Sequence, residues 1–380
     1  MSQVKPFSPL ELDYRISQTK ILVDEVSRKK AIETFIGVFI QLIQLPSFSM
    51  DHLKAFVKYL GYTDIMFYSL LSISKLIEGW AQEWPINDSP SEETRHIYLR
   101  NALSILLQLR IPQEDTKVRF FFKRDSKSSQ TYERPVAQYS EAFTRAWKSM
   151  VQIKLPKDVH HQVLLSLETV VFPYVNSPLL FIDFLTRSMG QGDITALLAL
   201  GGMSYLMLNN GAECPSFYTV LYSLIASPLC LCTPHTPLLL TQLDRFLSSP
   251  YLPQAVAASF VKRLLSHTLH TAPSASAVCG VLGVVHNILI RHPPLRTRMG
   301  LTPSKNTHPQ KIKENNNYIN NNNINNNNNT NTDNNTDNIN EESSIKISPF
   351  DPEEKDPQKT HAEDDQLWEI TVSYFFIINY

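Results

Sequence analysis

Glycine is scarce in this chain, which has 11 glycines against 24 prolines among its 380 residues. That balance favours helices begun by proline over glycine-rich turns. The central stretch, residues 178–263, has no glycine-rich phosphate loop, no cluster of metal-ligating residues and no nucleophile elbow. His160, His161 and His292 have no serine, cysteine or carboxylate constellation near them in the sequence. We therefore expect no enzyme, no cofactor and no resident metal.

Cysteine is also rare, and its spacing excludes a disulfide framework. The four cysteines are Cys214, Cys230, Cys232 and Cys279. They lack paired C-x-x-C spacing, which is typical of a protein of a reducing compartment. Cys230 and Cys232 could hold a metal in principle, but no second ligand pair lies near them in the sequence. The prediction is that these residues are buried thiols.

An excess of charge of one sign is missing as well. The chain carries 35 Lys and Arg against 36 Asp and Glu, which gives a net charge of −1. Proteins that coat nucleic acid draw on a strong basic excess, so that class is excluded. Any contact with RNA would have to come from a local basic patch.

Long hydrophobic runs are absent too. The first twenty residues have no apolar stretch of the signal-peptide kind. Three later runs, 194–208, 217–232 and 277–290, are each shorter than the ~20 residues that a membrane-spanning helix needs. Each is also broken by Gly, Ser, Pro or His. A multi-pass membrane protein of the nuclear envelope is one interpretation of these runs, and buried helices of a repeat are the favoured one.

What the sequence does have is a helical pattern through most of its length. Helix-start prolines recur at Pro178, Pro215 and Pro253, 37 and then 38 residues apart, and each interval holds two amphipathic patterns. No segment alternates with a period of two. We predict an all-α fold, a HEAT/armadillo-like helical-repeat solenoid with a disordered Asn-rich insertion, which is an architecture that builds surfaces for other macromolecules.

Local patterns predict particular helix faces and helix starts. Ser89-Pro90-Ser91-Glu92 is a capping box with proline at the first helical position, and Thr63 or Asp64 is expected to cap an earlier helix. The basic and aromatic run 117–124 is predicted to be either a short strand or a helical turn. The clearest buried stripes are Phe143, Trp147, Met150 and Val151; Val159, Val163, Leu167 and Val170; Leu239, Leu243, Phe246 and Leu247; and Phe260, Leu264 and Leu265.

Composition divides the chain into six predicted parts. The segment 302–347 is Asn-rich and cannot bury a core, so we expect it to be disordered, either as a tolerated expansion or as a prion-like assembly element. The parts are an N-terminal helical region (1–112), a polar connector (113–139), a helical-repeat domain (140–296), the Asn-rich linker (302–347), an acidic C-terminal segment (348–369) and an atypical terminus without a helical stripe (370–380).

Several sequence words also resemble one family. They are FTRAW (143–147), PLLFIDFLT (178–186), PSFYTVLYSL (215–224), DRFLSSPYLP (244–253) and VAASFVKRL (256–264). Together and in this order they look like the domain of the CCAAT-binding-factor family. The stretch FDPEEKDPQKTHAEDDQLWE (350–369) is similar to an acidic C-terminal signature of one member, which ends in Leu-Trp-Glu.

The resemblance implies a nucleolar, non-enzymatic assembly factor for the small ribosomal subunit with a helical-repeat fold. Such a factor would work in the small-subunit processome, paired with nucleolar protein 14, and would support the processing of precursor ribosomal RNA. Any contact with pre-ribosomal RNA could be indirect. The alternative, a nuclear transport adaptor of the importin type, would need regularly spaced tryptophans, and the four tryptophans here do not repeat.

Candidate partner-binding residues follow from these helices. Asp183 could contact a basic residue of a partner or tie helices together within the repeat. Lys262 and Arg263 could contact RNA phosphate or an acidic partner segment, or lie on a solvated helix face. The same alternatives, contact with RNA or an acidic partner segment or a place on a solvated helix face, apply to Arg187 and Arg245.

Two tryptophans and one acidic run complete the set of candidates. Trp147 is expected in the core, while Trp368, at the end of the acidic segment, is a candidate docking anchor for a partner. The acidic run 353–363 could pack on a basic surface of this chain or of a partner.

Overall fold

The protein is all-α in every part that the computed structural model describes, which is residues 7–20, 25–85, 90–111, 119–122, 136–249, 252–270, 273–301 and 348–378. Over these ranges the chain forms fifteen α-helices, four short 3-10 or π turns and no strand. The predicted fold class is thereby confirmed. The predicted disordered segment 302–347 lies outside the described residues. The chain divides into two compact units, Met1–Leu224 and Ile225–Tyr380.

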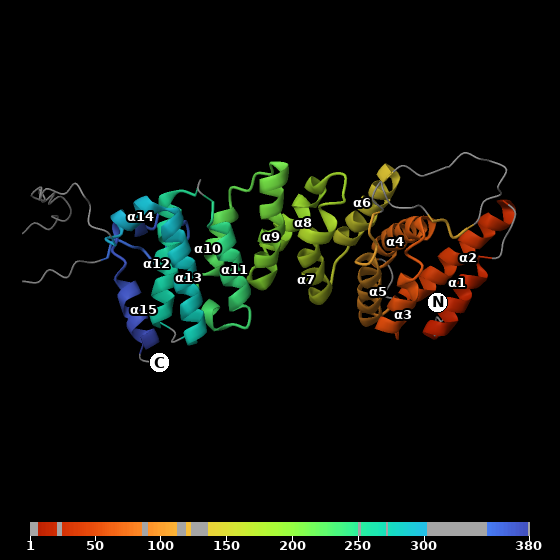
Figure 1. The fold of residues 1–380 in the computed structure, drawn as a ribbon, viewed down its shortest axis with the longest axis horizontal. Coiled ribbons are helices and arrows are strands. Elements are labelled where there is room, and N and C mark those ends of the chain that lie inside the picture. Colours follow the sequence, from red (N-terminus) through yellow and green to blue (C-terminus); the bar gives the residue numbers. More distant parts are fainter. Residues whose placement is uncertain are drawn as a thin grey trace, which may run out of the picture. The chain divides into compact units, whose positions relative to one another are not determined.

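The first unit contains ten α-helices, drawn in red to green in Figure 1. They are α1 (Pro9–Gln18), α2 (Glu25–Ile43), α3 (Met50–Val57), α4 (Thr63–Glu83), α5 (Glu92–Leu106), α6 (Val136–Gln152), α7 (Lys157–Ser166), α8 (Ile182–Met189), α9 (Asp193–Asn210) and α10 (Phe217–Leu224). α1 packs on α2 and α3, α2 on α4, α4 on α6, and α8 on α9. Packing between helices that are near in sequence is the behaviour expected of helical repeats.

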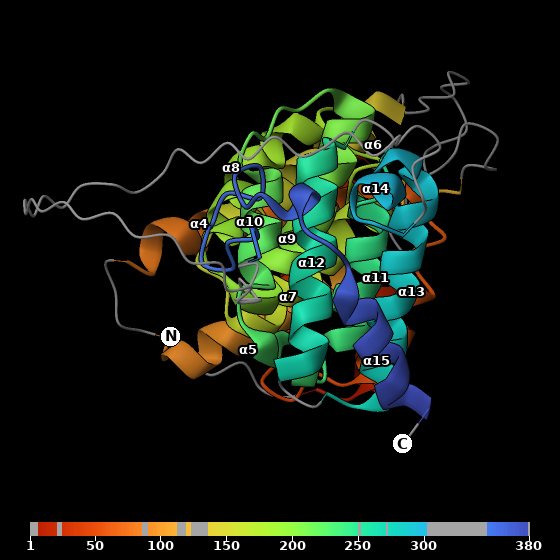
Figure 2. The same cartoon turned by 90° about the vertical axis from the view of Figure 1, so that its left-hand side faces the viewer.

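The second unit, drawn in green to blue in Figure 1, contains the remaining five. They are α11 (Thr236–Phe246), α12 (Gln254–His270), α13 (Ala275–Arg291), α14 (Pro293–Arg298) and α15 (Trp368–Ile378). α11 packs on α13, and α12 packs on both α13 and α15. Figure 2 shows α15 beside α12 and α13, although α15 follows them by about eighty residues or more.

The apolar stripes predict the buried helix faces well. Every residue of the stripes that start at Phe143, Leu239 and Phe260 is buried. In the stripe that starts at Val159 the last position is wrong, because Val171 is buried there and Val170 is only half-buried. A five-residue π turn over Leu167–Val171 causes this change, since it advances the helical phase by about one residue.

The basic and aromatic run differs from both of its predicted forms. Its described residues, 119–122, are neither strand nor helix. Instead, Asp64 near the start of α4 accepts the backbone N–H of Phe121 at 2.9 and 3.0 Å and that of Phe122 at 2.9 Å. Both phenylalanines are buried. Asp64 therefore tethers this run. The N-cap position of α4 is occupied by Tyr62, and not by Thr63 or Asp64 as predicted.

Two helix boundaries also differ from the prediction. α5 begins at Glu92 with Ser91 as its N-cap residue, two positions after the predicted capping residue. At the other end of the chain, residues without an apolar stripe form α15. Glu369 and Ser373, four residues apart, are buried in this helix, and their polar side chains meet α12 at Lys262 and Thr268. Buried polar residues such as these two add nothing to a hydrophobic period.

Two of the three apolar runs lie in packed helices, whereas the run 217–232 is divided between α10 and a 3-10 turn over Pro228–Cys232. Residues 194–208 fall within α9 and 277–290 within α13, and both helices bury a large share of their side chains. Across the described helices, none is both long enough and apolar enough to cross a bilayer.

Asp64 provides a test of the tether. Asp64→Ala should lower the free energy of unfolding by about 1–3 kcal/mol, because the N–H groups of Phe121 and Phe122 lose their acceptor in a buried setting. Chemical denaturation measures this change. Asp51→Ala is the matched control, since Asp51 is exposed and pairs with exposed Lys54, and it should cost less than about 0.5 kcal/mol. Equal effects of the two substitutions would contradict the assignment.

Candidate functional site

One face of α12 carries polar and charged side chains that are buried. Ser259, Lys262 and Arg263 lie three and four residues apart, so they share one side of the helix. Only 2% of Lys262 and 5% of Arg263 is exposed to solvent. The residues that cover them belong to the stretch 348–369, called the C-terminal segment below.

Lys262 holds the end of the C-terminal segment. Its ammonium Nζ lies 2.8 Å from Asp365 Oδ2 and 2.8 Å from Glu369 Oε1. It also donates a hydrogen bond to the carbonyl oxygen of Gln366 at 2.6 Å. Asp365 and Glu369 are themselves buried, so this is an ion-pair network shielded from water. Two carboxylates and one carbonyl satisfy the three donors of the ammonium group.

Arg263 and Ser259 hold the start and the middle of the C-terminal segment. Arg263 Nη2 donates to the carbonyl oxygens of Pro352 at 2.6 Å and Glu354 at 2.9 Å. The Ser259 hydroxyl lies within hydrogen-bonding distance of the Pro357 carbonyl oxygen. These contacts are to the backbone of the segment, so they fix its path without depending on the side chains that it carries.

A second set of contacts lies at the surface. Arg298, after α13, pairs with Glu363 at 2.9 Å and with Asp364 at 3.1 Å. The Arg298 side chain is 45% exposed, and exposed ion pairs contribute only about 0–1 kcal/mol. The buried network at Lys262 is different, because removing one member leaves opposite charges without compensation, which costs about 3–5 kcal/mol. Lys262 is therefore the dominant attachment.

These contacts decide between the interpretations of the acidic run. Its last residue, Glu363, pairs with Arg298 of this chain, as does the neighbouring Asp364. A solvated face at Lys262 and Arg263 is wrong, because both are buried. Nor are these two side chains open to RNA or to a partner in this arrangement, because the chain's own C-terminal segment occupies them.

Burial and charge act against each other on the pKa of Asp365. Burial by itself would raise that pKa above its ordinary value of 3.8. Hydrogen bonds from Lys262 and Ser348, together with the positive charge of Lys262, outweigh the burial and hold the pKa of Asp365 below that value. Asp365 is therefore ionised at neutral pH in spite of its position.

Trp368 sits at the edge of the network and faces outward. Its side chain is 55% exposed, and the Lys262 ammonium lies 5.8 Å from the centroid of its ring. A large aromatic side chain that a buried network holds at the surface suits an interaction anchor. That role stays a prediction, whereas Trp147 is fully buried in the core of its unit.

The other candidate residues lie on helix surfaces. Asp183 is exposed in the first turn of α8, and no described residue forms an ion pair with its carboxylate, so it ties no described helices together. Arg187 is exposed on the same helix and donates to the Asp183 carbonyl oxygen at 3.2 Å. Arg245 is exposed in the last turn of α11. Their partner-binding role also stays a prediction.

A histidine–serine pair appears that the local sequence does not reveal. His160 Nε2 lies 2.8 Å from Ser188 Oγ, and burial lowers the pKa of His160, with the charges of His161 and Arg187 adding to the effect. Ser188 is 1% exposed and also donates to the Phe184 carbonyl oxygen, so a substrate could not reach its hydroxyl. The pair joins α7 to α8.

The prediction of buried thiols is wrong. Cys214 and Cys230 are half-buried, and Cys232 and Cys279 are exposed. Cys279 lies beside rather than within the buried stripe of α13. Burial raises the pKa of the Cys230 thiol to about 11, which keeps it protonated at neutral pH. In the described part of the chain, no three potential ligands gather as a metal site would require.

The site contains residues that the sequence alone does not single out. Ser259 and Thr268 of α12, Asp365 and Ser373 all take part in holding the C-terminal segment and α15. They are separated from their partners by about a hundred residues, so no local pattern joins them. The sequence signal for these contacts is that VAASFVKRL and DDQLWE occur in the same chain.

The described helices, many of which pack on helices near them in sequence, define the class of all-α helical-repeat proteins. Residues 196–373, from α9 to Ser373 of α15, match the model of the CBF/Mak21 family. The predicted family resemblance is thereby confirmed. The matched region contains α12 and the C-terminal segment together.

Curated relatives extend the similarity beyond that domain. The chain is 30% identical to the nucleolar complex protein 4 homolog of Gallus gallus over 65% of this chain and 47% of that protein. It is 27% identical to the Rattus norvegicus homolog over 84% of this chain and 54% of that protein. It is 32% identical to Protein NUCLEOLAR COMPLEX ASSOCIATED 4 of Arabidopsis thaliana over 60% of this chain and 36% of that protein. The chain thus spans about half the length, or less, of these relatives.

The buried network makes a quantitative prediction. Lys262→Met should lower the free energy of unfolding of the second unit by about 3–5 kcal/mol, because Asp365 and Glu369 would remain buried without a cation. Chemical denaturation measures it, with Arg298→Met as the matched surface control. That control should cost about 1 kcal/mol or less. A loss at Lys262 no larger than the loss at Arg298 would refute the dominance of the buried network.

The lowered pKa of Asp365 predicts a dependence on pH. Since the folded pKa lies below the ordinary value of 3.8, the stabilisation is complete above about pH 3.8 and is lost as the pH falls through the folded pKa. The difference in unfolding free energy between the wild type and Asp365→Asn should therefore be constant from pH 7 to about pH 5 and shrink below about pH 3.8. A difference that grows on acidification would contradict the direction of the shift.

Proposed function

We propose that this protein is a non-enzymatic scaffold of the nucleolus that serves the assembly of the small ribosomal subunit and the processing of precursor ribosomal RNA. We also propose that it acts in the small-subunit processome in a complex with nucleolar protein 14. Similarity to proteins named nucleolar complex protein 4 supports this, because it extends over 84% of the chain for the Rattus norvegicus homolog. The helical-repeat fold is suited to such a role.

One observation carries the proposal. Two of the sequence words that carry the resemblance, VAASFVKRL in α12 and DDQLWE in the C-terminal segment, are in direct contact through Lys262, Asp365 and Glu369. Both words lie within the CBF/Mak21 match. The two words therefore form one folded structure, and Trp368 is a large apolar side chain that it presents to solvent.

Trp368 is proposed as the anchor for the protein partner. Interface energy concentrates in a few large side chains, and tryptophan is prominent among them. Lys262 and Arg263 contribute to partner binding indirectly, by fixing the segment that carries Trp368. Asp183, Arg187 and Arg245 are proposed as secondary contacts on exposed helix surfaces. With a net charge of −1 and its two α12 cations covered, the chain is proposed to reach pre-ribosomal RNA through its partners.

Affinity purification from nucleolar extract tests the proposal. A tagged full chain should recover nucleolar protein 14 and other small-subunit processome proteins. Trp368→Ala should reduce that recovery by about tenfold or more, as expected for an anchor worth about 2 kcal/mol. Leu208→Ala is the matched control, because Leu208 is an exposed apolar residue of α9, and recovery should not change.

Recovery of none of these proteins by the wild-type chain would overturn the proposed function. If the wild type recovers them and the Trp368 and Leu208 variants behave alike, the function stands and the anchor assignment fails.

A further inference from the structure

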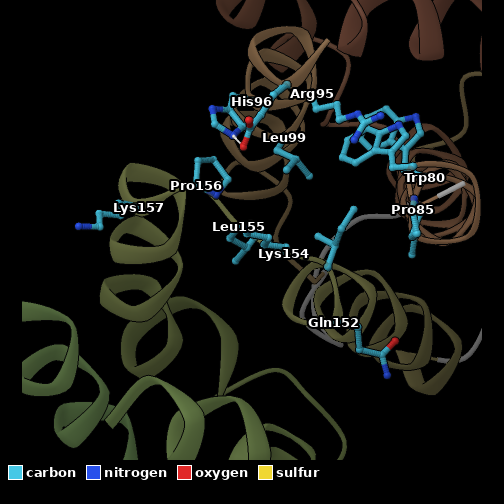
Figure 3. Close-up of a pocket in the computed structure, with 14 residues that line it drawn as sticks. Trp80, Pro85, Arg95, His96, Leu99, Gln152, Lys154, Leu155, Pro156 and Lys157 are labelled. Carbon is cyan, nitrogen blue, oxygen red and sulfur yellow. Dashed lines mark ion pairs between the residues drawn. The ribbon is translucent and has the colours of Figure 1, made fainter. Parts of the chain in front are cut away.

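The first unit contains a pocket that belongs to none of the sites described above. It has a volume of about 780 Å³, within the ~300–1,000 Å³ typical of ligand pockets. Three places in the chain line it, namely the end of α4, the first turns of α5 and the connection from α6 to α7. Figure 3 shows Trp80 and Pro85 of the first place facing Leu155 and Pro156 of the last across the pocket.

One wall is aromatic and already stacked. Trp80 and Trp84 lie with ring centroids 5.0 Å apart, and Tyr98 stacks on Trp80 at 5.8 Å. The Arg95 guanidinium lies 5.5 Å from the centroid of the Trp84 ring. Because Trp80 is only 5% exposed, the wall offers ring edges to a ligand and little open ring face.

The opposite wall is aliphatic with basic residues at its rim. Ile153 and Leu155 line it, and each is half-buried. Lys154 and Lys157 are exposed, and neither forms an ion pair with any residue that the structure describes. Lys157 extends outward from the edge of the pocket in Figure 3, toward solvent beside the first turn of α7.

The charge of the lining is unbalanced. Among the described lining residues, Arg95, Lys154 and Lys157 are cations, and Glu92 is the one carboxylate. Glu92 lies 3.7 Å from His96 of the same helix, so its charge is directed toward that neighbour. The described surroundings of the pocket therefore favour a ligand that carries negative charge.

We propose that this pocket binds an acidic peptide segment of a partner protein, with a large apolar side chain inserted between the tryptophan wall and Leu155. Carboxylates that flank the inserted residue would then meet Lys154 and Lys157 at the rim. A peptide fits better than single-stranded RNA, since bases stack on open aromatic faces, and here those faces are engaged by Trp84, Tyr98 and Arg95. The inference stands independently of the proposed function.

Selection from a random dodecapeptide library displayed on phage, with the full chain as bait, tests the proposal. Enriched peptides should combine Leu, Phe or Trp with several Asp or Glu residues. A fluorescein-labelled copy of the most enriched peptide should bind the double variant Lys154→Glu/Lys157→Glu at least about tenfold more weakly, because two attractions become repulsions. Leu155→Ser should also weaken binding, because the inserted side chain loses apolar contact.

The matched control reverses the same charge elsewhere in the first unit. Lys29→Glu/Lys30→Glu, at exposed positions of α2, should leave the affinity unchanged within about twofold. No enrichment, enrichment of peptides without acidic residues, or equal losses in the two double variants would overturn the proposal. So would tighter binding of a labelled oligouridine that depends on Lys154 and Lys157, because it would assign the pocket to RNA.

Discussion

The second unit depends on one buried cation. Lys262 lies in the middle of α12 with almost no solvent contact, and a buried ammonium group is tolerated only when opposite charge and acceptors surround it. Asp365, Glu369 and the Gln366 carbonyl oxygen supply these. α12 and the C-terminal segment therefore depend on each other. Without the segment the ammonium group of Lys262 has no opposite charge beside it, and without Lys262 the carboxylates of Asp365 and Glu369 have none.

This constraint shapes what the protein presents to others. The acidic segment is attached to its own chain and is not a free tail, and the basic residues beneath it are covered. Trp368, beside the ion pair, and the acidic residues around Arg298 remain at the surface. A binding surface fixed in advance loses less conformational entropy when a partner binds, which suits a scaffold.

The sequence predicts the helices and the family, but it does not predict the contacts that define the site. Apolar stripes such as the one at Phe143 identify core faces because burial of apolar surface dominates there. The same rule misses α15, in which the buried residues Glu369 and Ser373 are polar, and it misses Asp64, whose partners are backbone groups almost sixty residues away. Polar contacts between distant residues leave no periodic trace. The resemblance singles out the sequence words of both α12 and the C-terminal segment. It does not predict that the two are in contact.

Native-state hydrogen exchange on the full chain tests the central claim most directly. If Lys262 joins α12 to the C-terminal segment, the amides of residues 348–373 should be protected, with an opening free energy close to that of α12. Both should lose protection together in Lys262→Met. Exchange of residues 348–373 at the rate of an unstructured peptide, with α12 still protected, would contradict the account.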